Sequence, residues 1–518
     1  MESKLFNKKR KIRKEIADNF GQSSDKPRTI NLINTYYKFN KKGNLLLNEK
    51  TWIDLQMDDV FGFVDRTFSK TGQQVLYDKL HRIHTEKELN DFNLKVEYYE
   101  KNDDKKMENL FFLHQYENSC SYDLPDIFFN KINSTIPKWI LSLSLLSVIL
   151  LLLSFFYSQF MLPFISVAVI NTILHYYFKR NINFHYSIFK NISVFHTYYV
   201  KLLHNDNETE ILAADEKKKL HSISKKSFYL TLNIDNADDF SAILFYIIEI
   251  VKGVLLFDAI QFNRTINLIN KNSKILLKVS EFIGTIDSAI SVASLKAGCK
   301  NCTEPVFITD KEIVMADIYH PLIKDCKKNS IETHNNVIIT GANMTGKTTF
   351  LKAVGINVLL AQTINFAFCR ECKIPKMNIF SSIQNEDNLT DGVSFFMDEL
   401  LRTKQIVDSV NNSEYTHLIL IDEIYRGTNS EDRIALASSV LNYLTRDNCM
   451  VFVTTHDLDI ITFTGSNYEK YYFDYSLDKN KIVFDYSIQK GIRRKSNVIE
   501  LIKVLDFPKQ IIDNTILK

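Results

Sequence analysis

The sequence predicts an α/β domain with a mostly parallel sheet, C-terminal to an all-α region that carries an inserted apolar hairpin. Three observations support this prediction. After about residue 303, short β-branched runs alternate with helical segments, which is typical of buried parallel strands. Apolar residues recur at helical spacing over residues 50–120 and 180–297. Between these two helical stretches, residues 139–178 contain no Asp, Glu, Lys or Arg.

Length and composition limit the class of protein. A chain of 518 residues is long enough for two or three domains, and 45% hydrophobic with 24% charged residues favours packed cores over disorder. The formal net charge is only +3, so any contact with DNA must come from a local basic patch. Seven cysteines cannot all pair, which fits a reducing cytosol, and the N-terminus has no apolar run typical of a secretory signal.

The apolar stretch 139–178 is long enough for two membrane spans of about 20 residues each. Ser158 lies at the natural turn between them, and Lys138 and Lys179 flank the two ends. The positive-inside rule then predicts a membrane protein with both flanks and the α/β domain on the cytoplasmic side. The alternative is a buried hairpin in a large soluble core, but core helices rarely run so far without a charge.

A second apolar stretch, residues 240–262, carries Glu249, Lys252 and Asp258 at the spacing of an amphipathic helix. We predict a core or interfacial helix here, with a third membrane span as the alternative.

The chain is expected to contain five segments. They are a basic helical N-terminal extension (1–49), the first part of a helical core (50–137), a transmembrane hairpin (138–180), the second part of the core with a lever helix (181–302) and the α/β domain (303–518).

The first motif follows the predicted strand 337–340 and fits the pattern G-x-x-x-x-G-K-[ST]. In this strand–loop–helix context the backbone N–H groups of the loop can turn inward on the phosphates of a nucleotide. Lys347 would reach the β- and γ-phosphates, and the Thr348 hydroxyl would bind Mg²⁺. The predicted nucleotide-binding residues are Gly341, Ala342, Asn343, Met344, Thr345, Gly346, Lys347, Thr348 and Thr349.

Two further strand ends carry polar side chains. The apolar strand 418–421 ends in Asp422 and Glu423, and the strand 450–454 is followed by His456. Because the carboxyl ends of parallel strands meet at one edge of a sheet, Asp422 is placed to bind Mg²⁺. Glu423 can act as the general base for the attacking water, and His456 can donate to the γ-phosphate. Three such strand ends in one stretch argue against a chance match.

Five segments occur in a distinctive order: GANMTGKTTFLKAV, FSSIQNEDNLTDGVSFFMDELLRTKQIV, LILIDEIYRGTNSEDRIALA, VFVTTHDLD and IQKGIRRKSNVIELIKVLDFPKQII. This set resembles the ATPase domain of the MutS family. Upstream, WIDLQMDDVFGFVDRTFSKTGQQVLYDKL resembles the start of that family's helical core, and IGTIDSAISVASLKA resembles its lever helix. The resemblance covers residues 50–120 and 275–515.

The resemblance implies an ATP- and Mg²⁺-dependent hydrolase that works as a homodimer with two composite sites. Ser394 matches the signature segment that reaches across to the partner's ATP, and Asn343 matches the family's P-loop asparagine. Glu423 and His456 match the catalytic glutamate and the sensing histidine. From its position alone, Ser394 would be a helix N-cap.

The chain departs from the family pattern in several places. Ala342 and Thr345 stand where the family usually has Pro and Gly, and Tyr425 stands where it usually has Gly. The roughly 50 residues before the core cannot hold the domain that reads mismatches. The chain therefore resembles a membrane-associated branch of the family, assigned to DNA mismatch repair by kinship but not expected to recognise mismatches itself.

Two CxxC pairs, Cys299/Cys302 and Cys369/Cys372, raise the question of a zinc site. The P-loop strand and helix separate them in the sequence, and the family has no metal there. Idle or buried thiols are the preferred interpretation, and zinc is not expected.

Two functions remain open. The first is a membrane-tethered ATPase that contacts DNA backbone, for which the basic N-terminus offers Lys8, Lys9, Arg10, Lys11, Arg13 and Lys14. An anionic lipid surface or a solvated helix face would explain the same residues. The second is an ATP-driven switch or scaffold for a protein partner at the membrane, with no role on DNA. A protein that has lost its ATPase activity is a third possibility, but the presence of every expected catalytic side chain argues against it.

Overall fold

The computed structural model describes residues 2–24, 26–40, 47–117, 121–132, 136–206, 210–231, 239–383, 395–411, 416–425, 429–478, 481–492, 502 and 507–516. The chain forms two compact units. The first comprises Met1–Lys42, Asp65–Asp78 and Lys95–Leu295, and the second comprises Gly43–Val64, Lys79–Leu94 and Lys296–Lys518. The end of the predicted N-terminal extension and two segments of the predicted helical core, 50–64 and 79–94, thus cluster with the α/β domain.

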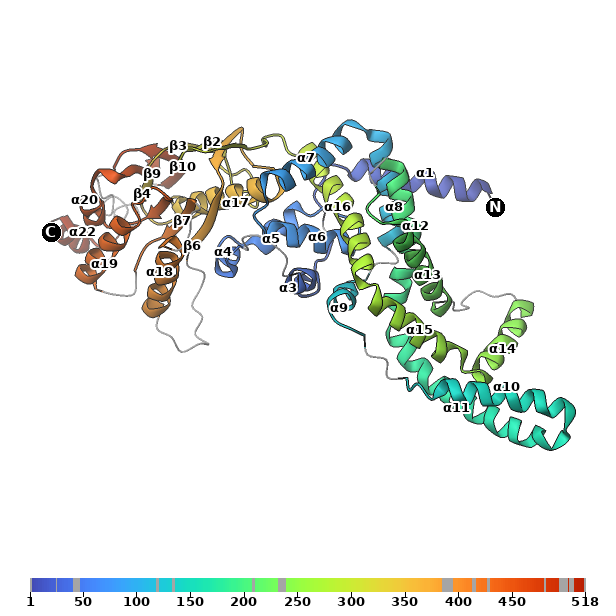
Figure 1. Ribbon diagram of the computed structural model, residues 1–518. Coiled ribbons are helices and arrows are strands. Elements are labelled where there is room, and N and C mark those ends of the chain that lie inside the picture. The colour runs from blue at the N-terminus through green and yellow to red at the C-terminus, as the bar shows by residue number, and fades with distance from the viewer. Residues whose placement is uncertain are drawn as a thin grey trace. The chain divides into compact units, whose positions relative to one another are not determined.

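The first unit is all-α, as the periodicity predicts (Figure 1). Its helices are α1 (Glu2–Asn19), α2 (Ile30–Ile33), α3 (Thr35–Phe39), α6 (Lys70–Leu80), α7 (Glu86–Lys101), α8 (Asp103–Glu117), α9 (Leu124–Phe129), α10 (Ile140–Phe156), η1 (Ser158–Phe160), α11 (Met161–Phe184), α12 (Tyr186–Asp206), α13 (Ala214–Leu230), α14 (Asp239–Val254), α15 (Phe257–Lys271) and α16 (Ser273–Gly298). The division between the units falls within α6, α7 and α16.

The start of α6 is fixed to α16 by a buried carboxylate. Asp287 accepts hydrogen bonds from the backbone N–H of Phe68 (3.0 Å) and from the N–H and hydroxyl of Ser69 (2.7 and 2.6 Å). These bonds satisfy the N–H groups of the two residues that immediately precede α6 and fix the start of that helix. A Cβ atom on Gly72 would lie 2.2 Å from this carboxylate, so only glycine fits at that turn.

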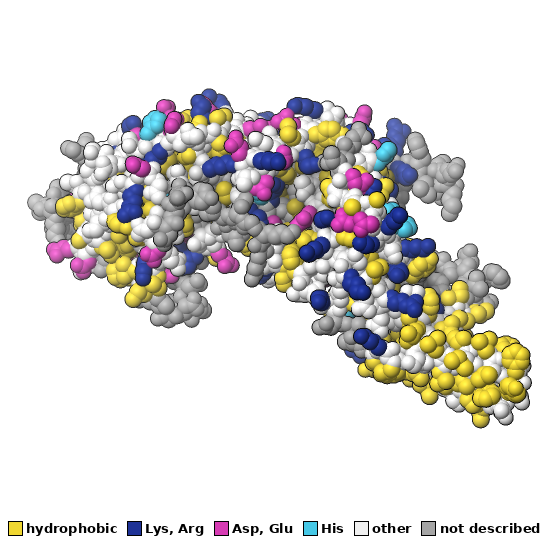
Figure 2. Space-filling view, in the orientation of Figure 1, with side chains coloured by type: hydrophobic (Ala, Val, Ile, Leu, Met, Phe, Trp, Pro, Cys, Tyr) yellow, Lys and Arg dark blue, Asp and Glu magenta, His cyan; other side chains and the backbone are white. Residues whose placement is uncertain are grey.

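Helices α10 and α11 form an antiparallel hairpin with an apolar surface (Figures 1 and 2). By length and composition, the segment Ser158–Phe184 could cross a membrane, and only 11% of its most apolar stretch is buried. Helix α10 has 17 residues, fewer than the roughly 20 expected for a span. The large apolar side chains exposed on the hairpin include Leu141, Leu145, Ile149, Leu152, Phe155, Phe156, Leu162, Ile165 and Ile173.

The second unit contains two sheets and the helices that pack on them (Figure 1). A six-stranded sheet has the order β10-β9-β4-β8-β7-β6, and a four-stranded sheet has the order β1-β5-β2-β3. The strands are β1 (Val306–Ile308), β2 (Ile313–Ile318), β3 (Asn329–Thr333), β4 (Asn336–Thr340), β5 (Glu371–Pro375), β6 (Met377–Ser382), β7 (Thr416–Asp422), β8 (Cys449–Thr454), β9 (Tyr468–Asp478) and β10 (Lys481–Lys490). The helices are α4 (Glu49–Asp54), α5 (Met57–Val64), α17 (Lys347–Ile364), α18 (Phe395–Asn411), α19 (Ser430–Tyr443), α20 (Leu458–Phe463), η2 (Gly465–Asn467) and α22 (Lys509–Ile516).

The predicted mostly parallel sheet is confirmed in the six-stranded sheet. Strands β6, β7, β8, β4 and β9 pair in parallel, and β10 is added antiparallel to β9. Strand β4 is buried along its whole length, with β9 on one side and β8 on the other. The carboxyl ends of β4, β8 and β7 therefore lie side by side at one edge of the sheet.

Helix α17 is buried against this sheet at close range. A Cβ atom on Gly355 would come within 2.5 Å of Leu420 on β7 and 2.9 Å of Leu55, which follows α4. Asp54, the last residue of α4, connects this helix to β6 and α18. It accepts hydrogen bonds from the Ser381 hydroxyl (2.6 Å) and from the guanidinium of Arg402 (3.3 Å). Residues 47–64 thus pack into the second unit.

Candidate functional site

The loop after β4 has the backbone conformation that a phosphate-binding loop requires. Gly341, Met344 and Gly346 all adopt positive φ angles of +143°, +65° and +107°. A Cβ atom on Gly341 would lie 2.5 Å from the carbonyl oxygen of Phe473 on β9, so this position accepts only glycine. The loop leads directly into the N-terminus of α17, where a helix dipole favours an anion.

Lys347 is directed into this loop. Its Nζ atom donates to the carbonyl oxygens of Gly341 (3.0 Å) and Ala342 (2.9 Å), and the residue is 4% exposed. Thr345 donates its hydroxyl to the same Ala342 carbonyl at 2.7 Å. Threonine is accommodated because its hydroxyl hydrogen-bonds within the loop.

Thr348 and Asp422 meet where α17 begins and β7 ends. The Thr348 hydroxyl donates to Asp422 Oδ2 at 2.8 Å, and the Thr454 hydroxyl at the end of β8 donates to Oδ1. A hydroxyl and a carboxylate oxygen are the ligands that Mg²⁺ prefers beside a nucleotide, so the donor set fits this ion. Thr454 was not predicted from the sequence, although its place at a strand end was a usable signal.

Glu423 and His456 lie in contact across the same edge. Their Oε1 and Nε2 atoms are 2.8 Å apart, and His456 Nε2 is also 3.3 Å from Lys347 Nζ. Glu423 has a φ of +51°, and its N–H donates to the Thr454 carbonyl and hydroxyl oxygens. The structure thus brings together the predicted base, the predicted sensor and the P-loop lysine.

The other predicted site residues lie around this group. Asn343 and Met344 are exposed at the tip of the loop, and Thr349 lies on the first turn of α17. Ser394 lies outside the described residues, so its predicted role stays a prediction.

A pocket that was not predicted from the sequence adjoins the P-loop. It has a volume of about 380 Å³, and its lining includes Thr349, Phe350, His320, Ile323 and Tyr486. Burial and the nearby Lys352 ammonium lower the pKa of His320 to about 4, so its ring is neutral at neutral pH. Aromatic and neutral polar side chains beside a phosphate-binding loop are suited to hold the nucleoside part of a nucleotide.

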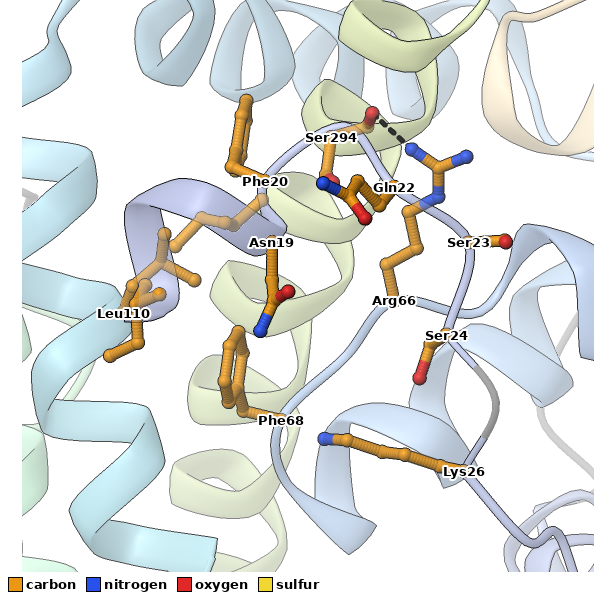
Figure 3. Close-up of a pocket in the computed structure, with 12 residues that line it drawn as sticks. Asn19, Phe20, Gln22, Ser23, Ser24, Lys26, Arg66, Phe68, Leu110 and Ser294 are labelled. Atoms are coloured by element: carbon orange, nitrogen blue, oxygen red, sulfur yellow. Dashed lines mark hydrogen bonds between the residues drawn. The ribbon is translucent and has the colours of Figure 1, made fainter. Parts of the chain in front are cut away.

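A second cavity, of about 260 Å³, lies in the first unit (Figure 3). Phe20 and Phe68 line it, and Arg66 donates to the backbone carbonyl of Ser294 beside it. Lys26 lies over the Phe68 ring at 4.7 Å from its centroid. The cationic groups of this cavity are therefore engaged with the protein itself.

The two CxxC pairs lie on neighbouring segments, although the P-loop strand and helix separate them in the sequence. Thr303 and Ala367 exchange two backbone hydrogen bonds of 3.0 Å, and Cys299 Sγ is 3.3 Å from the Tyr319 hydroxyl. Hydrogen bonding to Cys369 and burial raise the pKa of the Cys372 thiol well above its usual range.

Comparison with known proteins identifies the family. Residues 337–517 match the family model described as MutS domain V. This part of the chain belongs to the MutS family. Its matched domain contains the P-loop and the three strand ends that form the site.

Three curated relatives of this MutS-family chain illustrate the range of similarity. The DNA mismatch repair protein MutS of Persephonella marina is 31% identical over 246 residues, 45% of this chain and 28% of that protein. MutS of Thermotoga maritima is 28% identical over 256 residues, 47% of this chain and 32% of that protein. The DNA mismatch repair protein MSH3 of Debaryomyces hansenii is 29% identical over 281 residues, 50% of this chain and 27% of that protein. The chain thus spans about a third or less of the length of these relatives.

The unusual Tyr425 yields a stability prediction. Its φ is +60°, which costs a non-glycine residue about 1–2 kcal/mol, but its side chain is buried against Phe396. Truncating a buried aromatic side chain costs about 3–5 kcal/mol, which exceeds the strain that glycine would relieve. Tyr425→Gly should therefore destabilise this MutS-family protein by about 1–4 kcal/mol, measured by urea unfolding.

The matched control is Tyr425→Phe, which keeps the backbone strain and the ring packing and should lose about 1 kcal/mol or less with the hydroxyl. If the glycine variant were as stable as the phenylalanine variant, the relief of backbone strain would offset the loss of ring packing, and the prediction would be wrong.

Proposed function

We propose that this chain is a membrane-tethered MutS-type ATPase that binds and hydrolyses ATP with Mg²⁺ at composite sites in a homodimer. The convergence of Lys347, Thr348, Asp422, Glu423 and His456 at the carboxyl ends of β4, β7 and β8 supports this proposal. A loop that cradles phosphates, a carboxylate–hydroxyl pair and a carboxylate beside a histidine are the groups that phosphoryl transfer requires.

Each side chain has a distinct role in the proposed reaction. The backbone N–H groups of the loop and Lys347 bind the phosphates, and Lys347 exchanges the loop carbonyls for phosphate oxygens. Thr348 and Asp422 would hold Mg²⁺, which neutralises charge on the phosphates. In the reaction, Glu423 accepts the proton of the attacking water. His456, which contacts Glu423 in the structure, donates a hydrogen bond to the terminal phosphate.

The composite site requires a second copy of the chain. The segment around Ser394 would reach the partner's nucleotide, and this assignment rests on the family resemblance. In such a site ATP would be bound between two copies of the chain. We therefore expect ATP binding to change the arrangement of their helical units.

The membrane tether is proposed for residues 139–178. Its support is the exposed apolar surface of α10 and α11, together with the positive flanks Lys138 and Lys179. An exposed apolar surface of this extent is disfavoured in water and marks a membrane or protein contact. We place both flanks and the α/β domain on the cytoplasmic side.

Two roles are compatible with such an ATPase. The first is DNA binding through backbone contacts, which the names of the relatives favour. Helix α1 offers exposed basic residues for this contact, among them Lys9, Lys11 and Lys14. The second is an ATP-driven switch for a protein partner at the membrane, which the exposed hairpin favours. A measurement of DNA binding distinguishes the two roles.

We expect the detergent-purified protein to bind duplex DNA, matched and mismatched alike, in a manner that ATP regulates and salt weakens. The logarithm of the binding constant should fall linearly with the logarithm of salt concentration, with a slope of about 0.9 for each phosphate contact. A Lys9→Gln, Lys11→Gln, Lys14→Gln triple variant should show a shallower slope, measured by fluorescence anisotropy.

The control variant carries Lys218→Gln, Lys219→Gln and Lys225→Gln, which remove three exposed charges of α13 and should leave the slope unchanged. Absence of binding by the unmodified protein at low salt would reject the DNA role and favour the membrane switch.

A further inference from the structure

The inner face of the apolar hairpin carries a polar stripe. Asn171, His175 and Lys179 follow one another at intervals of four residues on α11, which places them on one side of the helix. Helix α11 packs against α14 and α15. The Asn171 amide donates to the carbonyl of Val254 (2.8 Å) at the end of α14 and so satisfies a helix-terminal acceptor.

Three side-chain atoms of this stripe lack hydrogen bonds. Both ring nitrogens of His175 and the Oδ1 atom of Asn171 are buried and make no hydrogen bond to the described residues. His175 is 2% exposed and Asn171 is fully buried. Buried polar atoms are nearly always satisfied in native proteins, so a missing partner at such a position calls for an explanation.

Two carboxylates face the histidine from the neighbouring helices. His175 Nε2 is 3.6 Å from Glu249 Oε2 on α14 and 4.0 Å from Asp258 Oδ2 on α15. One donor atom from each of the three side chains can be chosen so that all lie within 4.8 Å of one another. These separations are too long for hydrogen bonds, but ligands of a tetrahedral ion with bonds of about 2.1 Å are about 3.4 Å apart.

We propose that His175, Glu249 and Asp258 bind a divalent transition-metal ion. One imidazole and two carboxylates form the mixed nitrogen and oxygen set that suits Mn²⁺, Fe²⁺ or Zn²⁺. Because the ligands come from α11, α14 and α15, the ion joins the inner end of the hairpin to the helical unit.

Two lysines balance the carboxylates when no ion is bound. Lys179 Nζ lies 2.8 Å from Glu249 Oε2, and Lys252 Nζ lies 3.2 Å from Glu249 Oε1. The metal must displace Lys179 from the oxygen that also faces His175. The Lys179 side chain is 31% exposed, so its ammonium can turn outward to solvent or to lipid headgroups. Lysine and metal therefore compete for one carboxylate, and removing the lysine should strengthen metal binding.

The test is a titration of the chelator-treated, detergent-purified full chain with Mn²⁺, without nucleotide, in which free Mn²⁺ is measured by electron paramagnetic resonance. Mn²⁺ prefers oxygen and nitrogen donors, so the cysteine thiols should not compete for it. We expect one ion per chain. His175→Ala and Glu249→Gln should weaken binding at least about 100-fold, because loss of a ligand exceeds loss of an outer-shell partner.

Three further variants make the test selective. His204→Ala removes an exposed histidine of α12 and should leave binding unchanged. Asp422→Asn removes the proposed Mg²⁺ ligand and should also leave it unchanged. Lys179→Met should tighten binding, and this variant tests the proposal even where His175→Ala fails to fold. Equal affinity of the Lys179→Met and unmodified proteins, binding that survives His175→Ala, or binding that requires Asp422 would each overturn the metal site.

Discussion

Replacing Glu423 by Gln should leave ATP binding intact and lower the turnover number by about 100- to 10,000-fold, the range that general-base catalysis contributes. Gln has nearly the same shape, so the carbonyl oxygen of its amide can still contact His456. It cannot accept a proton from the attacking water. Glu423 Oε1 and His456 Nε2 are 2.8 Å apart, and the substitution removes the negative charge of the carboxylate beside the histidine. Turnover is measured by phosphate release and binding by a fluorescent ATP analogue.

The matched control is Glu431→Gln on the exposed first turn of α19, which should keep full turnover. His456→Ala separates the two roles that Glu423 could have. If Glu423 served only to orient His456, both variants would lose the same activity, and the double variant would lose no more. Normal hydrolysis by Glu423→Gln would show that another group is the base.

Deleting residues 139–178 should move the protein from the membrane fraction to the soluble fraction. Helices α10 and α11 run antiparallel in contact, so a short Gly-Ser linker can join the two flanks. Removal of the hairpin takes away the exposed apolar side chains that favour lipid. The measurement is sedimentation of cell membranes before and after carbonate washing, which strips peripheral proteins.

A milder variant tests the same interaction without deletion. Lysine at Ile149 and Leu152, both exposed on α10, should cost about 2.5–3.5 kcal/mol each at the centre of a span and should lower membrane retention. Val306→Lys, at an exposed apolar position of β1, should not change it. If the deletion variant stayed in the washed pellet, another part of the chain would bind the membrane. The hairpin would then be a contact surface for a protein.

The polar edge of the six-stranded sheet was predictable because its signals are local. A P-loop is one continuous strand, loop and helix, and its glycines are needed where φ is positive, as at Gly341 and Gly346. Asp422 and His456 follow buried strands, and parallel strands bring their carboxyl ends to the same edge. The order of motifs also sufficed to indicate the family, because that order is itself a sequence property.

Other features depend on contacts between residues that are far apart in the sequence. The pairing of Glu423 with His456, the Thr454 hydroxyl on Asp422 and the pocket lined by His320 arise from sheet order and loop packing. The CxxC pairs lie on adjacent segments because Thr303 pairs with Ala367, a bridge that no spacing rule predicts.

By itself, the sequence determined the P-loop, the polar strand ends, the family and the apolar character of residues 139–178, because each depends on neighbouring residues. Only the tertiary structure decided that residues 47–64 pack with the α/β domain and that His175 faces Glu249 and Asp258. A polar stripe on an apolar helix can be read from spacing, but its partners come from two other helices. Which buried charges meet is set by the packing of those helices, and packing is a property of the whole chain.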